Sequence, residues 1–305
     1  MNTNKKHDKN VVNGAFVVAF SYLLWGILPL YWKLLAHVSA ISILANRIIW
    51  SLVFTAILIY FQSRWEELKS GINSRKELLH LFFRSFFIGS NWLIFIWGIN
   101  NGHVLECSLG YFINPLMTVF LGCVFLKESL NKYQIVALIL TSIGVLLLIF
   151  NYGYIPWISL LVAVTFAFYS LLKKTSTSEA LTGLTAEVAI LTVPALIYLA
   201  VISIKSGSLY FLQESLTTNI LLILSGIVTA VPLLLFANGI RKIRLSLAGP
   251  LQYIAPTCTF LLGVFVFKEN FTRMHLISFI IIWLSLVIFS CSSLPKAKKY
   301  VVGEL

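Results

Sequence analysis

Three ionisable residues lie inside long apolar stretches of the sequence, where a charge needs a chemical reason. Arg47, Glu106 and Glu187 each interrupt a run of mostly Leu, Ile, Val and Phe. A charge at the centre of a bilayer costs about 2.5–3.5 kcal/mol on insertion scales, so such residues are functional candidates by default. The planar donor fork of Arg47 suits a carboxylate or a phosphate. The structural alternative is that Arg47 pairs with a helix-end carbonyl or with Glu106.

The two carboxylates differ in what they could do. Glu106 could bind an ammonium group or take up a proton, although the helix dipole also favours a carboxylate at a helix N-terminus. On the same helical face, at i+4 and i+8, lie Gly110 and Asn114, whose small and polar groups suit a cavity wall. For Glu187 we predict a capping role near the start of its helix.

Uncharged polar and aromatic side chains extend this set. Amides within apolar spans would be unsatisfied against lipid, so they should face protein or water. Trp and Tyr side chains could enclose a flat or cationic solute, or simply mark the membrane interfaces. We therefore predict a substrate-binding site formed by Arg47, Asn91, Trp92, Trp97, Glu106, Tyr111, Asn114, Asn238, Gln252 and Tyr253.

Two prolines within the apolar spans, and the absence of enzyme motifs, also bear on the function. Pro115 and Pro256 each remove a backbone hydrogen bond within an apolar span, so we predict a hinge at both. The sequence contains no P-loop, GxSxG, HExxH or CxxC motif. We expect a protein that is not an enzyme and that uses no cofactor and no metal.

The elements that must position these residues are membrane helices. Of the 305 residues, 59% are hydrophobic and only 11% are charged, whereas a soluble domain carries about 25% charged residues. A membrane helix needs about 20 mostly apolar residues. The sequence predicts ten such spans, at residues 13–35, 41–61, 79–99, 104–126, 133–150, 156–173, 184–204, 219–239, 246–267 and 275–291.

The basic residues predict how these spans are oriented, because short cytoplasmic loops carry an excess of Lys and Arg. With the N-terminus inside and ten spans, 18 of the 23 basic residues lie on the cytoplasmic side. The net charge of +12 therefore belongs to short loops between spans. Because no basic stripe follows a folded face, we expect no nucleic-acid partner.

An internal repeat divides the chain in two. A shift of 141 positions brings residues 111–128 onto residues 252–269 without a gap, matching Pro115 with Pro256 and Lys127-Glu128 with Lys268-Glu269. This shift spans five helices, an odd number, so the two halves must insert in opposite orientations. We predict an all-α membrane protein of two inverted five-helix repeats, residues 13–150 and 151–291, with cytoplasmic tails at 1–12 and 292–305. Such inverted repeats recur in secondary transporters.

Three segments carry a family resemblance. Residues 89–115, together with residues 46–51 and 252–256, resemble the RarD permeases of the EamA branch of the drug/metabolite transporter superfamily. The resemblance implies ten helices in two inverted repeats, with a central cavity lined mainly by the third, fourth, eighth and ninth helices. It also implies the name "chloramphenicol-sensitive protein", which describes a phenotype and not a substrate.

Together these observations predict a secondary transporter, most simply an exporter, of the bacterial inner membrane. Its substrate would be a small amphipathic metabolite, an amino acid or a drug, moved by alternating access. A lipid or amphiphile flippase and a membrane scaffold without transport activity are the alternatives. The expected partners are the small-molecule substrate and the lipid bilayer, and the sequence leaves open whether the protein forms a homodimer.

Overall fold

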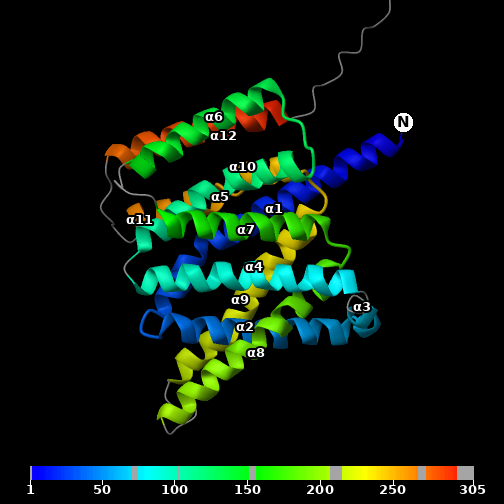
Figure 1. Ribbon diagram of the computed structural model, residues 1–305, viewed down its shortest axis with the longest axis vertical. Coiled ribbons are helices and arrows are strands. Elements are labelled where there is room, and N and C mark those ends of the chain that lie inside the picture. Colours follow the sequence, from blue (N-terminus) through cyan, green and yellow to red (C-terminus); the bar gives the residue numbers. More distant parts are fainter. Residues whose placement is uncertain are drawn as a thin grey trace, which may run out of the picture.

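The protein is a bundle of helices that run alternately in opposite directions (Figure 1). The computed structural model describes residues 2–70, 75–101, 103–150, 156–206, 215–266 and 273–293, and within these ranges there is no strand. The helices are α1 (Asn2–Leu34), α2 (Ala40–Phe61), α3 (Trp65–Ser70), α4 (Arg75–Asn100), α5 (Val104–Phe125), α6 (Lys132–Phe150), α7 (Trp157–Thr175), α8 (Ala180–Ser206), α9 (Leu216–Ile240), α10 (Leu245–Leu251), α11 (Ile254–Phe265) and α12 (Arg273–Ser293).

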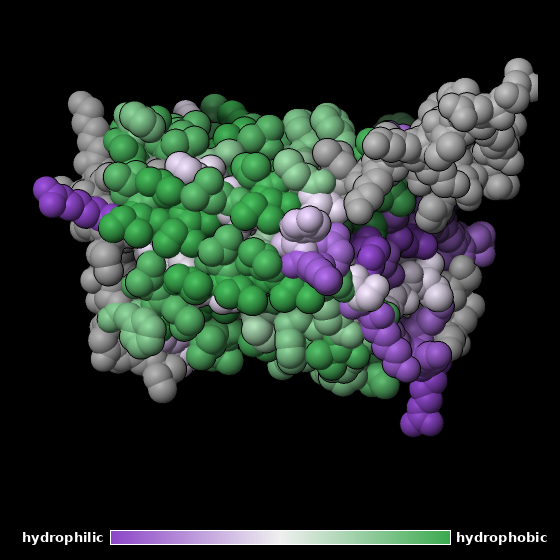
Figure 2. Space-filling model, turned by 90° about the horizontal axis from the view of Figure 1, so that it is seen from above, coloured by the Kyte–Doolittle hydropathy of each residue, from purple (hydrophilic) through white to green (hydrophobic). Residues whose placement is uncertain are grey.

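Six of these helices are long and apolar enough to cross a membrane, namely α1, α2, α4, α7, α8 and α9. Helices α5, α6 and α12 contain shorter apolar stretches. Large apolar side chains remain exposed along most helices, and they cover much of the surface in Figure 2. An apolar surface of this extent is favourable only in lipid. The chain is therefore a multi-pass membrane protein, whereas the ten-span arrangement stays a prediction.

Hydrophilic residues gather at one end of the bundle, the end that holds α3 (Figure 2). We call it the charged end and the other the opposite end. Helices α4, α6, α8 and α10 begin at the charged end, and α2, α5, α7 and α9 finish there (Figure 1). Among the described side chains, most basic residues lie at this end, namely Arg64, Lys69, Arg75, Lys76, Lys127, Lys132, Lys173, Lys174, Arg241, Lys242 and Arg244.

Aromatic side chains hold the centre of the bundle together. Tyr22 and Trp25 of α1, Phe166 of α7 and Phe236 of α9 lie with ring centroids 5.2–5.9 Å apart. Tilted and edge-on ring pairs of this kind are favourable in buried clusters. They fix α1, α7 and α9 relative to one another.

Close backbone contact joins α2 to α9. A side chain at Gly226 would place its Cβ 2.3 Å from the backbone carbon of Trp50. The Ser51 hydroxyl donates to the Gly226 carbonyl at 3.0 Å. Glycine is therefore required at this crossing, because only a residue without a side chain lets the backbones approach so closely.

The ninth predicted span is broken, which corrects the expectation of one continuous helix over residues 246–267. Helix α10 ends at Leu251 and α11 begins at Ile254, so Gln252 and Tyr253 form a tight turn between them. Pro256 explains the break, because it has no N–H to donate to the Gln252 carbonyl. That carbonyl instead accepts from the Ala255 N–H, three residues on, at 3.3 Å.

Helix α5 behaves differently at the equivalent proline, since it continues through Pro115 from Val104 to Phe125. The nearby Phe112 carbonyl accepts a hydrogen bond from the Tyr253 hydroxyl at 2.8 Å. A donor from the turn between α10 and α11 therefore contacts α5 beside its proline. The paired hinges stay a prediction, and a break is present at one of the two positions.

Candidate functional site

Arg47 is half-buried on α2, seven residues beyond the start of that helix at Ala40. At 1.5 Å per residue it is about 10 Å from the opposite end. Trp92 of α4 and Tyr111 of α5 lie at similar depth, eight residues before the end of α4 and seven after the start of α5. Three helices therefore bring these predicted site residues to one level.

The guanidinium of Arg47 contacts aromatic rings. Its central carbon lies 4.4 Å from the centroid of the Trp92 ring and 5.5 Å from that of Trp32, near the end of α1. Both distances are within the range of cation–π attraction. Tyr111 is close enough to interact electrostatically with Arg47, and 40% of its surface remains exposed.

Arg47 makes no hydrogen bond and no ion pair within the described part of the chain, and its buried Nε has no partner there. An arginine carries five N–H donors in a fixed fork. Donors kept from water without an acceptor are costly, so the site favours an acceptor supplied from outside. Glu106 belongs to α5, and its side chain lies outside the described residues.

A second group of predicted residues is already paired within the protein. Gln252 Nε2 donates to Thr118 Oγ1 at 2.9 Å, and the Thr118 hydroxyl donates to Asn114 Oδ1 at 3.4 Å. Tyr253 is bonded to the α5 backbone, and Gln252 and Tyr253 are each 2% exposed. These groups hold the break between α10 and α11 against α5.

The structure places the remaining predicted residues apart from Arg47. Asn91 donates to the Val162 carbonyl at 2.8 Å and to Thr165 Oγ1 at 3.0 Å, so it joins α4 to α7. Trp97 is 44% exposed and stacks on His103 with centroids 5.8 Å apart. Asn238 is exposed, close to the charged end of α9.

Gly110, expected on a cavity wall, instead marks a helix contact. A Cβ at this position would lie 3.0 Å from the Ser159 carbonyl oxygen of α7. The small residue therefore lets α5 and α7 pack closely.

A buried charge cluster is the feature that the sequence analysis missed. Glu187 of α8 is completely buried, with Lys173 Nζ 2.7 Å and Arg84 Nε 3.3 Å from its Oε1. The Tyr169 hydroxyl donates to its Oε2 at 3.2 Å. Lys173 and Arg84 are 3% and 2% exposed. We call these four residues the Glu187 cluster.

The predicted capping role of Glu187 is wrong. Helix α8 begins at Ala180, so Glu187 lies seven residues beyond its start and faces α4 and α7. Arg84 carried a signal that could have revealed this, because it lies between Phe82, Phe83, Phe86 and Phe87. A cation within such an apolar run needs a buried anion.

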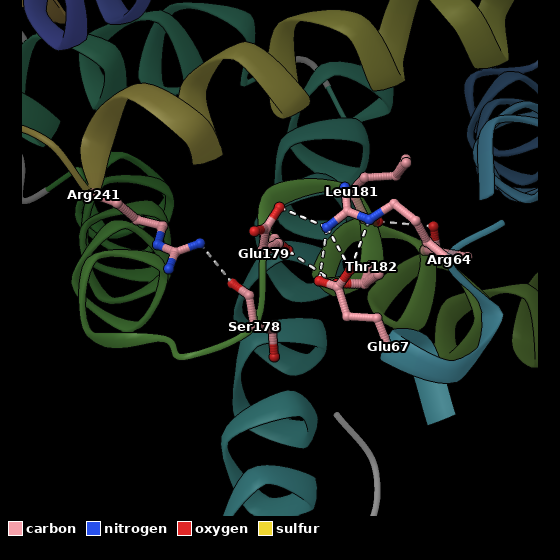
Figure 3. Close-up of polar contacts among 8 residues, drawn as sticks. Arg64, Glu67, Ser178, Glu179, Leu181, Thr182 and Arg241 are labelled. Atoms are coloured by element: carbon pink, nitrogen blue, oxygen red, sulfur yellow. Dashed lines mark hydrogen bonds and ion pairs between the residues drawn. The ribbon is translucent and has the colours of Figure 1, made fainter. Parts of the chain in front are cut away.

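Polar contacts close the charged end. Figure 3 shows Arg64 between two carboxylates, with Nη2 2.6 Å from Glu179 Oε2 and Nε 2.7 Å from Glu67 Oε2. The two carboxylates raise the pKa of Arg64 above its ordinary value. Arg241 at the end of α9 donates to the Ser178 carbonyl at 3.1 Å.

The loop after α5 contributes to the same closure. Glu128 accepts from the N–H groups of Leu245 and Ser246 at 2.8 and 2.7 Å. The carboxylate therefore satisfies the free N–H groups at the start of α10. The equivalent Glu269 lies outside the described residues.

These features define a class of protein, a helical multi-pass membrane protein with a polar site inside its bundle. The chain belongs to the EamA-like transporter family, whose profile matches it twice, over residues 12–150 and 154–291. It is 44% identical over 284 residues to a Bacillus subtilis (strain 168) protein named "Uncharacterized transporter YojE", covering 92% of this chain and 94% of that protein.

Two further comparisons agree with this assignment. The chain is 42% identical over 281 residues to "Protein RarD" of Escherichia coli (strain K12), covering 92% of this chain and 95% of that protein. The predicted resemblance is thus confirmed. A solved crystal structure matches with a TM-score of 0.68 at 16% identity, over 92% of this chain and 98% of the other, which indicates a shared fold.

Proposed function

We propose that the protein is a secondary transporter that moves a small amphipathic solute, such as a metabolite, an amino acid or a drug, by alternating access. The observation that carries the proposal is Arg47, a membrane-embedded cation that faces aromatic side chains and has no acceptor in the described part of the chain. An intramembrane charge of this kind marks a pathway or a binding site. The activity is a movement of solute, and no catalytic step is proposed.

The helix bounds support two inverted copies of one unit. The 141-residue shift carries α4 (Arg75–Asn100) onto residues 216–241, where α9 (Leu216–Ile240) lies. It carries α5 onto α10 and α11 together, and α6 onto α12, with starting residues that coincide. Two similar halves in opposite orientation give similar inward-open and outward-open states, which is the basis of alternating access.

Helix packing also follows this symmetry. Helix α1 packs on α9, and its counterpart α7 packs on α4, the counterpart of α9. Helices α2 and α8 pack on each other, as do α6 and α12. Ten spans, with both termini on one side, are the simplest arrangement that fits this pattern.

Orientation follows from the charged end. Because basic residues favour the cytoplasmic side, we place the charged end, with both termini, in the cytoplasm of a bacterial cell and the chain in its inner membrane. The closed charged end and the half-exposed Tyr111 near the opposite end support a state that faces outward. A solute released in this state would be exported.

Transport by purified protein in proteoliposomes tests the proposal. A metabolite comparison between a deletion strain and an overexpressing strain supplies candidate solutes, and flux of the best one is then measured directly. We expect saturable flux that falls at least tenfold in Arg47→Gln and weakens in Glu106→Gln. Arg75→Gln, the same change at an exposed position, is the matched control for Arg47. Flux that does not saturate, or that is unchanged in Arg47→Gln, would contradict the proposal.

A further inference from the structure

We infer that the transported solute carries a negative charge, and that its acidic group binds the guanidinium of Arg47 while its apolar body lies against the neighbouring aromatic rings. This inference rests on the proposed transport function and adds the chemical class of the substrate to it. The class is an organic anion, with a carboxylate as its simplest acidic group.

The balance of buried charge is the first step. Among the described side chains, Arg84, Lys173 and the carboxylate of Glu187 are buried, whereas Arg47 is half-buried with its Nε kept from water. Oε1 of Glu187 lies in ion-pair contact with the two cations of its cluster, and Oε2 accepts from the Tyr169 hydroxyl. Among the described side chains, no carboxylate is therefore left to balance the positive charge of Arg47. A buried charge is stabilised by an opposite charge with good hydrogen bonds, and an anionic solute supplies both.

The aromatic rings give the second step. Trp92 and Trp32 could in principle receive a cationic solute, but Arg47 already lies 4.4 Å and 5.5 Å from their centroids. A second cation at these rings would lie beside the first and be repelled by it. The edges of the indole and phenol rings remain suitable for an apolar body. Aromatic contact and cation repulsion together favour an amphipathic anion over an amine.

The donor geometry gives the third step. The Nε of Arg47 is buried without a partner in the described ranges. Arginine presents two parallel N–H groups that match the two oxygens of a carboxylate. A carboxylate can therefore be held by two parallel donors, whereas a primary amide offers one oxygen.

A ligand-binding experiment tests the charge class separately from transport. Purified protein in nanodiscs is heated with benzoate, phenylacetate, 4-hydroxybenzoate, indole-3-acetate and octanoate, each compared with the primary amide and the amine of the same carbon skeleton. We expect the unfolding temperature to rise with one or more carboxylates and not with the matched amides or amines. Arg47→Gln should abolish this rise, Arg47→Lys should weaken apparent affinity at least tenfold because it lacks the planar fork, and Arg75→Gln should leave it unchanged.

Two outcomes overturn the inference. One is a set in which no carboxylate stabilises the protein more than its amide. The other is stabilisation by amines or amides, or stabilisation by carboxylates that is as large in Arg47→Gln as in the unmodified protein. Saturable flux of a neutral or cationic solute in proteoliposomes would leave the transport function standing and refute only the anionic class, so the two failures are distinguishable.

Discussion

Replacing Glu187 with glutamine should destabilise the protein more than removing either of its cationic partners. The substitution keeps the size of the side chain and removes its charge. Lys173 and Arg84, which lie 2.7 Å and 3.3 Å from Oε1, would then be buried without an anion. Removing Lys173 instead leaves Arg84 and Glu187 as a balanced pair, which still accepts from Tyr169.

The size of the effect follows from the geometry. Two unit charges about 4 Å apart attract by about 4 kcal/mol at an effective dielectric constant near 20. Glu187→Gln loses two such attractions and recovers several kcal/mol because the carboxylate no longer has to be desolvated. Removing one partner of a buried ion pair lowers the free energy of unfolding by about 3–5 kcal/mol in proteins. We expect Glu187→Gln to lower it by an amount in this range. For Lys173→Met we expect the free energy of unfolding to fall by about 2 kcal/mol less than for Glu187→Gln, because no uncompensated charge remains.

Unfolding in increasing concentrations of a denaturing detergent, followed by intrinsic fluorescence, measures the free energy of unfolding of each variant under identical conditions. Glu67→Gln is the matched control, because it makes the same chemical change in a carboxylate that is 37% exposed, and exposed pairs contribute about 0–1 kcal/mol. The double variant Glu187→Gln/Lys173→Met should be more stable than Glu187→Gln alone, since it removes one of the two stranded cations.

The reasoning is refuted if Lys173→Met destabilises the protein as much as Glu187→Gln, or if Glu187→Gln matches the Glu67→Gln control. Either result would mean that the cluster is hydrated, or that its charges are balanced from elsewhere.

Three further predictions follow from single contacts. Gly226→Ala should cost about 1–3 kcal/mol through overpacking, because the added Cβ meets α2 backbone at 2.3 Å; detergent unfolding measures it, and wild-type stability would contradict the contact. Tyr253→Phe should cost about 1 kcal/mol, because the buried Phe112 carbonyl loses its side-chain donor; hydrogen exchange should rise beside the α10–α11 break and nowhere else. Arg47→Met should raise the unfolding midpoint while abolishing flux, because a charge without a described partner opposes folding; a lowered midpoint would show that Arg47 is a structural residue.

Hydrophobic runs predicted the helices well, because lipid requires every span to be long and apolar. They could not predict the break at Gln252, since the break depends on which carbonyl loses its donor and not on composition. Pro115 and Pro256 look alike in the sequence. Only the packing shows that the Tyr253 hydroxyl donates to the α5 backbone three residues before Pro115.

Arg47 was predicted to lie within a span and is half-buried on α2, whereas Glu187 was misassigned by a small boundary error. The sequence placed the start of its span at residue 184, which puts Glu187 in the first turn, but α8 begins at Ala180. Four residues are about one helical turn. In a membrane helix, one turn separates a cap that touches water from a charge that must find its partners inside.

The repeat relates the Glu187 cluster to the region around Arg47. Under the 141-residue shift Glu187 corresponds to Asn46, Lys173 to Trp32 and Arg84 to Ser225. Ion pairs at the charged end thus have neutral counterparts near the opposite end. Symmetric halves alone would make the two open states equal in energy. Ion pairs join α4, α7 and α8 at one end, and the described positions that correspond to them are neutral, so under the proposed mechanism we expect the charged end to be the harder one to open.

A transporter with this asymmetry needs its solute to change state. In the proposed transport cycle, the Glu187 cluster would hold the charged end closed without solute, while Arg47 lies about 10 Å from the opposite end with its donors free in the described part of the chain. A ligand shifts such an equilibrium only by its differential affinity for the two states. Arg47 is on α2, which packs on both α8 and α9. An acidic group that neutralises Arg47 would therefore act on the helix that joins the two halves. The binding energy of that contact could offset the cost of breaking the ion pairs of the Glu187 cluster.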